Sequence, residues 1–191
     1  MTMCDYCRHD NECMQPQWHI NAVINGDMYC EAFKSWLKRN ISMAYVTPSF
    51  VTNNKSVTRR NWANVTIKQF KKEIKALVWN KQARFGGEPI GVLELTENPF
   101  KQGTNNMTET DYVGEGFQYL DIEYCEIITG KPHLTEKIYP LIETFNTWAR
   151  RGNMMTVVPF KIIEVFPGIE DKYTTDKEII RCVKALKKAI G

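Results

Sequence analysis

The sequence predicts an α+β fold in which a small curved sheet or barrel is flanked by helices. Segments 89–96 and 155–166 are rich in branched apolar residues and are predicted strands. The segment Thr175–Glu178 matches a helix capping box, and an apolar stripe at helical spacing follows it. With 191 residues, 43% of them hydrophobic, the chain can bury a core. Short strands broken by short helices favour a mixed fold.

The first forty residues are predicted to form a separate cysteine-rich module with a connecting helix, and residues 41–191 the main domain. Four cysteines fall early in the chain: Cys4, Cys7, Cys13 and Cys30. A Cys-x2-Cys turn with two later thiolates can hold a tetrahedral zinc ion, and His9 or His19 could replace one thiolate. An iron–sulfur cluster takes the same four thiolates, and ordinary free cysteines are the third alternative. Because the segment is polar, a metal would supply folding energy that it otherwise lacks.

The predicted elements of the first half follow in chain order. A helix over 29–39 has Asp27 as its N-cap and an apolar stripe opposite its lysines. A short strand over 42–46 leads to a helical turn that Thr47 and Pro48 open, and that ends near Asn53. Segment 66–73 is predicted to be a short amphipathic helix and 76–80 an apolar strand. A polar turn through Gly86-Gly87 then leads to the strand over 89–96, where Gly91 can mark a bulge.

The second half begins with a predicted loop over 101–106. Thr108 is expected to cap a helix over 109–120, which Gly114 and Gly116 interrupt so that Glu115 lies at a turn. A longer helix over 135–151 is expected to kink or restart at Pro140. The strand over 155–166 contains Pro159, which suggests an edge strand or a bulge. The stripe of the last helix comprises Ile179, Ile180, Val183, Leu186 and Ile190.

A basic stretch, Lys55-Ser56-Val57-Thr58-Arg59-Arg60, stands out in an otherwise balanced chain. Lys and Arg number 25 against 22 Asp and Glu, so a basic surface must come from local clustering. If the stretch is extended, Lys55 and Arg59 lie on one face and Thr58 and Arg60 on the other. A bend at Asn53-Asn54 would have to precede it. The simplest alternative is a solvated basic strand with no special role.

The chain shows no basic segment followed by an apolar one at its start, and no apolar run of membrane-spanning length. A cytoplasmic protein that does not enter membranes is therefore expected. Cys125 and Cys182 lie in apolar surroundings and are predicted to be packing residues.

Four segments in order resemble the ASCH domain, a branch of the PUA-like barrels. They are 55–60 followed by Trp62, the strand over 90–95, the run Gly114-Glu115-Gly116-Phe117, and the closing strand over 157–166. The resemblance covers roughly residues 42–166. The family pattern Gly-x-Lys-x-x-x-x-Arg is met by Lys55 and Arg60, with Asn53 in the glycine slot. Asn is the next-best residue where a positive φ is needed.

The resemblance implies a small barrel whose cleft takes a nucleobase, a nucleoside or a segment of RNA. Some small bacterial members are amidohydrolases that remove the acetyl group from acetylated cytidine. Their lysine, threonine and glutamate match Lys55, Thr58 and Glu115. A desolvated lysine can act as a base toward a hydroxyl, and Arg59 or Arg60 can hold a phosphate or an oxyanion.

Two functions follow, and both are expectations at this point. In the first, the protein binds RNA, DNA or a modified nucleoside. A basic run meets phosphates and one of three aromatic residues, Phe50, Trp62 or Trp79, stacks on a base. The basic run comprises Lys55, Arg59, Arg60, Lys68, Lys71 and Lys72, of which Lys71 and Lys72 are expected to be solvated. In the second, it hydrolyses an acetylated cytidine-type nucleoside. A protein-interaction adaptor built on the cysteine module is a third alternative.

Overall fold

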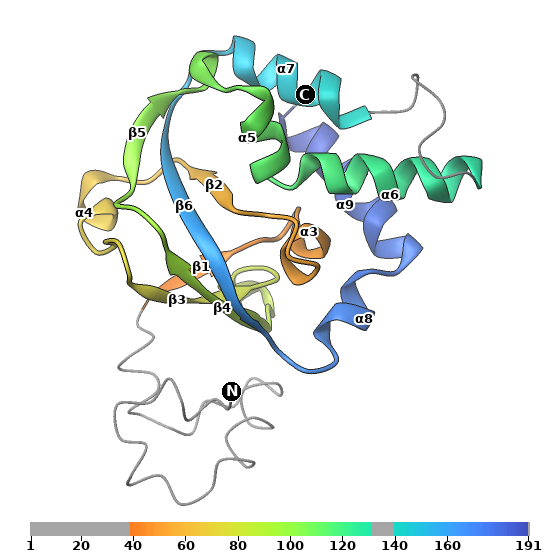
Figure 1. The fold of residues 1–191 in the computed structure, drawn as a ribbon, viewed down its shortest axis with the longest axis horizontal. Coiled ribbons are helices and arrows are strands. Elements are labelled where there is room, and N and C mark those ends of the chain that lie inside the picture. Colours follow the sequence, from red (N-terminus) through yellow and green to blue (C-terminus); the bar gives the residue numbers. More distant parts are fainter. Residues whose placement is uncertain (1–38, 131–139, 191) are drawn as a thin grey trace, which may run out of the picture.

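A mixed sheet curled into a half-barrel lies beside a group of helices (Figure 1). The computed structural model describes residues 39–130 and 140–190. Its strands are β1 (Asn40–Ser42), β2 (Val57–Arg60), β3 (Lys75–Trp79), β4 (Pro89–Leu95), β5 (Phe100–Gly103) and β6 (Met154–Val165). They pair in the order β1-β3-β4-β6-β2, and β5 also pairs with β6. The β1–β3 pair is parallel and the others are antiparallel, so the predicted α+β class with a curved sheet is confirmed.

Strand β6 is central, which corrects the edge position suggested by its proline. β2, β4 and β5 all pair with it. Pro159 lies between the part of β6 that pairs with β5 and the part that pairs with β4. The amide of Phe160 donates to Ser56 beside β2, so the nitrogen of the preceding proline faces away from β2. A residue without an N–H is tolerated there because neither ladder needs that donor.

The predicted bulge near Gly91 is present in β4. Val78 pairs with Gly91 and Trp79 with Pro89, so Ile90 is the extra residue. A Cβ on Gly91 would lie 2.3 Å from the carbonyl oxygen of Glu164. Only glycine fits this close approach of two backbones.

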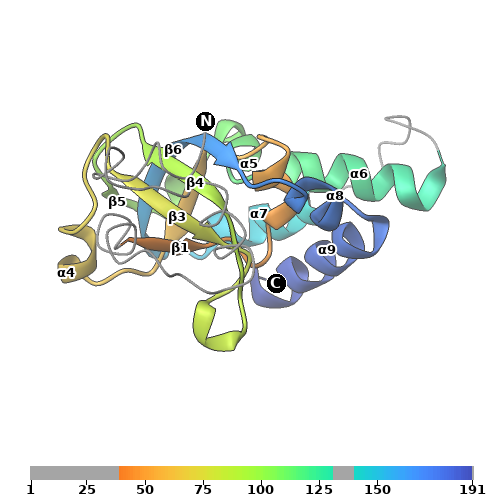
Figure 2. The ribbon, with the colours of Figure 1, turned by 90° about the horizontal axis from the view of Figure 1, so that it is seen from below.

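The described helices cluster on one side of the sheet, except α4 (Figures 1 and 2). They are α3 (Thr47–Val51), α4 (Asn64–Ile67), α5 (Glu109–Gly114), α6 (Phe117–Thr129), α7 (Pro140–Arg150), α8 (Ile169–Tyr173) and α9 (Asp176–Ile190), with short 3-10 turns η3 (Ala83–Phe85) and η4 (Thr104–Asn106). α9 packs on α6 and α7. Its apolar stripe buries Ile179, Cys182, Val183 and Leu186, close to the predicted set. The thiol groups of Cys125 and Cys182 are buried, as predicted.

Several boundaries differ from the predictions. The helix expected over 66–73 is the single turn α4, because the chain leaves helical geometry and reaches Glu73 with a φ of 66°. The loop expected over 101–106 is the strand β5 followed by η4. β5 was missed because its exposed polar residues lack apolar alternation. The strand expected over 42–46 is β1, which ends at Ser42.

Other predictions fall outside the described residues. They include the cysteine module, its connecting helix and the first turn of the helix predicted from 135. In the described part, that helix begins at Pro140. None of the described helices combines the length and apolar character needed to cross a membrane.

Candidate functional site

A cleft of about 600 Å³ opens where the sheet meets the helices, and we name it the main cleft. Lys55, Thr58, Arg59, Arg60 and Glu115 all line it. The structure therefore brings five of the residues singled out from the sequence to one hollow. Of these, Lys55, Thr58, Arg59 and Glu115 are each less than a tenth exposed. The site is built into the fold and is not a solvated basic strand.

The side chain of Lys55 is fixed by Glu115. Lys55 Nζ donates to Glu115 Oε2 at 2.8 Å and to the Glu115 carbonyl oxygen at 2.7 Å. Two local features bring these residues together. Asn53 has a φ of 60°, as expected for its slot, and turns the chain from α3 into β2. The amide of Ser56 donates to the Gly114 carbonyl at 2.9 Å, which ties the start of β2 to the end of α5.

Glycines let the α5–α6 junction approach β2 and α3. Gly116 has a φ of 81°, and a Cβ there would lie 2.4 Å from the Cβ of Ser49. Ser49 Oγ donates to the Gly116 carbonyl at 2.7 Å. A Cβ on Gly114 would lie 2.8 Å from a methyl of Val57. The predicted interruption of the helix is confirmed, and its physical reason is this close packing.

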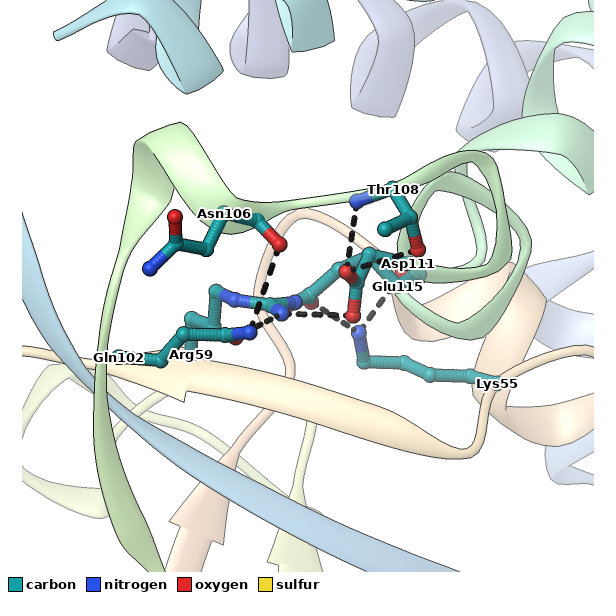
Figure 3. A network of polar contacts seen from close by, with 7 residues as sticks. All are labelled: Lys55, Arg59, Gln102, Asn106, Thr108, Asp111 and Glu115. Carbon is teal, nitrogen blue, oxygen red and sulfur yellow. Dashed lines mark hydrogen bonds and ion pairs between the residues drawn. The ribbon is translucent and has the colours of Figure 1, made fainter. Parts of the chain in front are cut away.

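Arg59 extends the network away from Lys55 (Figure 3). Its guanidinium donates to Glu115 Oε1 at 3.2 Å, to Asp111 Oδ1 at 2.6 Å and to Gln102 Oε1 at 2.8 Å. Asp111 Oδ2 accepts from the amide of Thr108 at 2.8 Å, which completes the capping box of α5. Lys55 and Arg59 share Glu115, as the alternation of an extended strand predicts.

Two pKa values in this network are shifted, one by burial and one by hydrogen bonds. Burial lowers the pKa of Lys55 below its ordinary value, although the neighbouring Glu115 carboxylate opposes the shift. The pKa of Asp111 is also lowered: burial alone would raise it, but hydrogen bonds from Arg59 and Thr108 outweigh burial. The lysine is therefore easier to deprotonate than a surface lysine.

Arg60 differs from Arg59 in its partners. Its Nη2 donates to the Ser42 carbonyl and lies 3.6 Å from the sulfur of Met43. Its Nε is buried without a hydrogen-bond partner. Among the described residues, no carboxylate lies within ion-pair distance of it. Burial lowers the pKa of Arg60, which remains protonated at any ordinary pH.

Thr58 is buried on β2, opposite Val158 of β6, and lines the main cleft. Two of the three predicted stacking residues lie elsewhere. Phe50 is completely buried in α3 beside Phe160, so its ring has no exposed face on which a base could stack. Trp62 stacks on Phe70 with ring centroids 4.6 Å apart, and it lines a second, smaller pocket.

The aromatic walls of the main cleft were missed by sequence reasoning. They come from Tyr45, Phe85, Phe117 and Trp148. These residues belong to four distant segments, and no local pattern relates them. Asp111 was missed as well, although its position three residues after Thr108 is that of the reciprocal partner in a capping box.

The four cysteines predicted to bind a metal, Cys4, Cys7, Cys13 and Cys30, lie outside the described residues. Within residues 39–130 and 140–190, no three His, Cys, Asp or Glu side chains are grouped to hold a metal ion.

Comparison with known proteins gives little. No protein-family model matches the chain, and no curated protein matches it. Among solved structures, the chain is similar to protein EF3133 from Enterococcus faecalis V583, described as a DUF984 family member. The two are 12% identical with a TM-score of 0.39, and the match covers 64% of this chain and 72% of that one. A likeness this distant transfers no function to the chain.

Proposed function

We propose that the main cleft binds a nucleotide, a modified nucleoside or a segment of RNA or DNA. The observation that carries the proposal is the charge around the cleft. Lys55, Arg59, Arg60 and Lys81 line it, and Glu115 is the single carboxylate among its described lining residues. Glu115 is shared by Lys55 and Arg59, which leaves Arg60 and Lys81 to attract an anion. An arginine in a partly desolvated cleft suits phosphate oxygens especially well.

The size and walls of the cleft support the same ligand class. A volume of about 600 Å³ is within the range of small-molecule sites. Tyr45 and Phe85 at the cleft are 47% and 64% exposed, so both rings offer surface on which a base could stack. The guanidinium of Arg84 lies 4.9 Å from the centroid of the Phe85 ring and adds a further positive charge there. These rings replace Phe50 and Trp62 as the stacking residues of the main cleft.

The binding proposal is tested by comparing two variants, each of which replaces one cation by a neutral glutamine. Calorimetric titration with CMP and with a short single-stranded RNA would measure the Kd of the wild type, Arg60→Gln and Lys71→Gln. Lys71 is exposed and does not line the cleft, so it is the matched control. Arg60→Gln is expected to weaken binding by roughly tenfold or more, because hydrogen bonds to charged groups are strong. Wild-type protein that binds neither probe would refute the proposal.

A second candidate is an amidohydrolase that acts on an acetylated cytidine-type nucleoside. It is supported by Lys55, Thr58 and Glu115 lining one cleft, and by the lowered pKa of Lys55. In this chemistry Lys55 would take the hydroxyl proton of Thr58, and the threonine oxygen would attack the acetyl carbon. Lys55 would return that proton to the amide nitrogen as the bond between this nitrogen and the acetyl carbon breaks, and cytidine would leave. Water would then hydrolyse the acylated threonine to acetate and free threonine. We rank it second because Glu115, at 2.8 Å, favours the charged lysine over the neutral base.

Hydrolysis has its own test. Release of cytidine and acetate from acetylcytidine would be followed by chromatography for the wild type, Lys55→Ala and the control Lys71→Ala. Loss of turnover in Lys55→Ala alone would support the enzyme. Wild-type protein that binds acetylcytidine without releasing acetate would exclude this activity and leave the binding proposal standing.

The cysteine module remains a separate prediction from the sequence. We propose that Cys4, Cys7, Cys13 and Cys30 bind zinc, since their thiolates match its preferred ligands. Elemental analysis of the purified full chain should give about one zinc per chain. A brown protein with visible absorption would instead indicate an iron–sulfur cluster.

A further inference from the structure

A smaller pocket of about 290 Å³ adjoins the main cleft. Ser42, Arg60 and Gln82 line both hollows. The remaining walls of the smaller pocket include Trp62 and Trp79. Arg60 therefore stands at the boundary between a charged cleft with aromatic walls and a pocket lined by two indoles.

Arg60 has few hydrogen-bond partners and no ion pair among the described residues at this boundary. Its Nη2 donates to a backbone carbonyl and contacts a thioether sulfur, and its Nε has no hydrogen-bond partner among the described residues. No described carboxylate forms an ion pair with it, and the attraction that it receives from Glu115 acts at longer range. A partly buried cation with an unpaired N–H is stabilised by an anion that also accepts its hydrogen bonds. An anion that reaches Arg60 would lie between the two hollows.

The two tryptophans give the smaller pocket its chemistry. One face of Trp62 is supported by the ring of Phe70, with an interplanar angle of 24°. Trp79 is held by a hydrogen bond from its Nε1 to Asn40 Oδ1 at 3.2 Å. Both rings are thus fixed before any ligand arrives. Trp79 is only 9% exposed and belongs to the core, so it forms a wall of the pocket. Trp62 is half-buried and is the indole on which a base can stack, because every base has a π-face.

We infer that the ligand contains at least two nucleotides. Arg60 binds the phosphodiester that links them, one base occupies the main cleft, and the next base occupies the smaller pocket and stacks on Trp62. This inference rests on the proposed function and names its ligand class as a single-stranded nucleic acid. A pocket of about 290 Å³ lies at the lower end of ligand-site volumes, which suits one base and its sugar.

Two exposed alanines allow each hollow to be blocked separately. Ala83 on η3 lines the smaller pocket and not the main cleft, while Ala189 on α9 lines the main cleft and not the smaller pocket. Both side chains are exposed, so a phenylalanine at either position leaves the core packing unchanged. Ala83→Phe and Ala189→Phe are therefore matched variants that add the same ring to different hollows.

The experiment measures the Kd of CMP and of the dinucleotide CpC for the full-length wild type and both variants. We expect CpC to bind the wild type about tenfold more tightly than CMP, because a second stacked base adds affinity. Ala83→Phe should abolish that advantage and bring the two Kd values to within about twofold of each other. Ala189→Phe should weaken both ligands. The deoxy dinucleotide, measured in parallel, shows whether RNA or DNA is preferred.

The other outcomes separate the two proposals. Equal Kd values for CMP and CpC in the wild type would overturn the two-nucleotide inference and leave nucleotide binding intact. A CpC advantage that survives in Ala83→Phe would place the second base outside the smaller pocket and also overturn the inference. If neither probe binds the wild type, the proposed function fails, and the inference fails with it.

Discussion

At the scale of single residues, the site depends on which buried cation pairs with which carboxylate. Glu115 is 4% exposed and receives hydrogen bonds from both Lys55 and Arg59. Arg59 also reaches Asp111, so two cations and two carboxylates form one connected group. Buried charges are tolerated when each has a partner of opposite sign. Arg60 forms no ion pair within this group, and for that reason it is available to a ligand, together with Lys81.

The contribution of this charge network to stability can be tested by neutralising Glu115, the carboxylate that Lys55 and Arg59 share. In Glu115→Gln, Lys55 and Arg59 lose their shared carboxylate while their charges stay buried. We expect the free energy of unfolding to fall by about 3 kcal/mol or more, as for other buried pairs that lose one partner. Urea denaturation measures the change. Glu97→Gln, at an exposed position, is the control and should change stability little. A loss no larger than that of the control would mean that the network is not important for stability.

At the scale of elements, the α5–α6 junction places Glu115. Gly116 and Gly130 both have positive φ angles, 81° and 66°. They differ in their surroundings, because a Cβ on Gly116 would strike Ser49 while a Cβ on Gly130 would meet nothing within 4 Å. Comparing substitutions at Gly116 and Gly130 therefore separates the energetic cost of a left-handed backbone from the cost of close packing.

Alanine at each glycine gives the comparison. Gly130→Ala should cost about 1 kcal/mol of stability from its left-handed backbone alone. Gly116→Ala should cost about 2 kcal/mol more, because overpacking adds to the same strain. It should also weaken CMP binding by moving Glu115, whereas Gly130→Ala should not. Thermal and urea unfolding of both variants measure the costs. Equal losses would show that the approach to Ser49 imposes no constraint.

A second element-scale feature joins three helices at one buried acid. Asp121 of α6 accepts from the hydroxyl of Tyr112 at 2.6 Å and from the amide of Leu141 at 3.0 Å. It thereby connects α5 and the first turn of α7. Burial raises the pKa of Asp121 to about 6, although these hydrogen bonds oppose the shift. In the unfolded chain an aspartate has a pKa near ~3.9.

The raised pKa of Asp121 predicts the direction in which folding stability changes with pH. The folded protein holds the Asp121 proton more tightly than the unfolded chain, so this stabilisation is complete below pH about 4 and lost as pH rises through about 6. Relative to Asp121→Asn, the wild type should therefore lose roughly 2 kcal/mol of stability between these limits. Urea denaturation across this pH range tests it, with the exposed Asp171→Asn as control. Parallel pH profiles for wild type and Asp121→Asn would refute the assignment.

At the scale of the whole molecule, the main cleft belongs to no single element. Its charged residues come from β2 and Lys55 just before it, from the α5–α6 junction and from Lys81 after β3, and its walls come partly from α7 and α9. The chain has a formal net charge of only +3, so attraction to nucleic acid must arise at this cluster. The salt dependence of binding reports how many phosphates are contacted.

Salt titration therefore distinguishes cleft cations from surface cations. The slope of log K against log salt concentration for single-stranded RNA should fall in magnitude by about 0.7 in Arg60→Gln, the loss of one phosphate contact. The slope of Lys71→Gln should equal that of the wild type. Fluorescence anisotropy at several salt concentrations measures both. If Lys71→Gln lowers the slope and Arg60→Gln does not, nucleic acid binds a different face.

The sequence by itself determined the local features of this protein. Strands β3, β4 and β6 and helix α9 follow from apolar periodicity and a capping box. The bend at Asn53 and the break at Gly116 follow from the φ angles that these residues adopt. Such features depend on neighbours within a few positions, so the printed chain is sufficient to find them. It also predicted that Lys55 and Glu115 would lie near one another, through the resemblance and not through spacing.

Only the tertiary structure decided how distant residues divide their roles. Arg59 and Arg60 are adjacent in sequence, yet the strand directs one to Asp111 and the other to the carbonyl of Ser42. Phe50 is a core residue because its ring lies beside Phe160 of β6 and Gly91 of β4, while Phe85 is exposed beside the cleft. The physical reason is that pairing, burial and cavity shape depend on the register of strands and the packing of helices far apart in the chain.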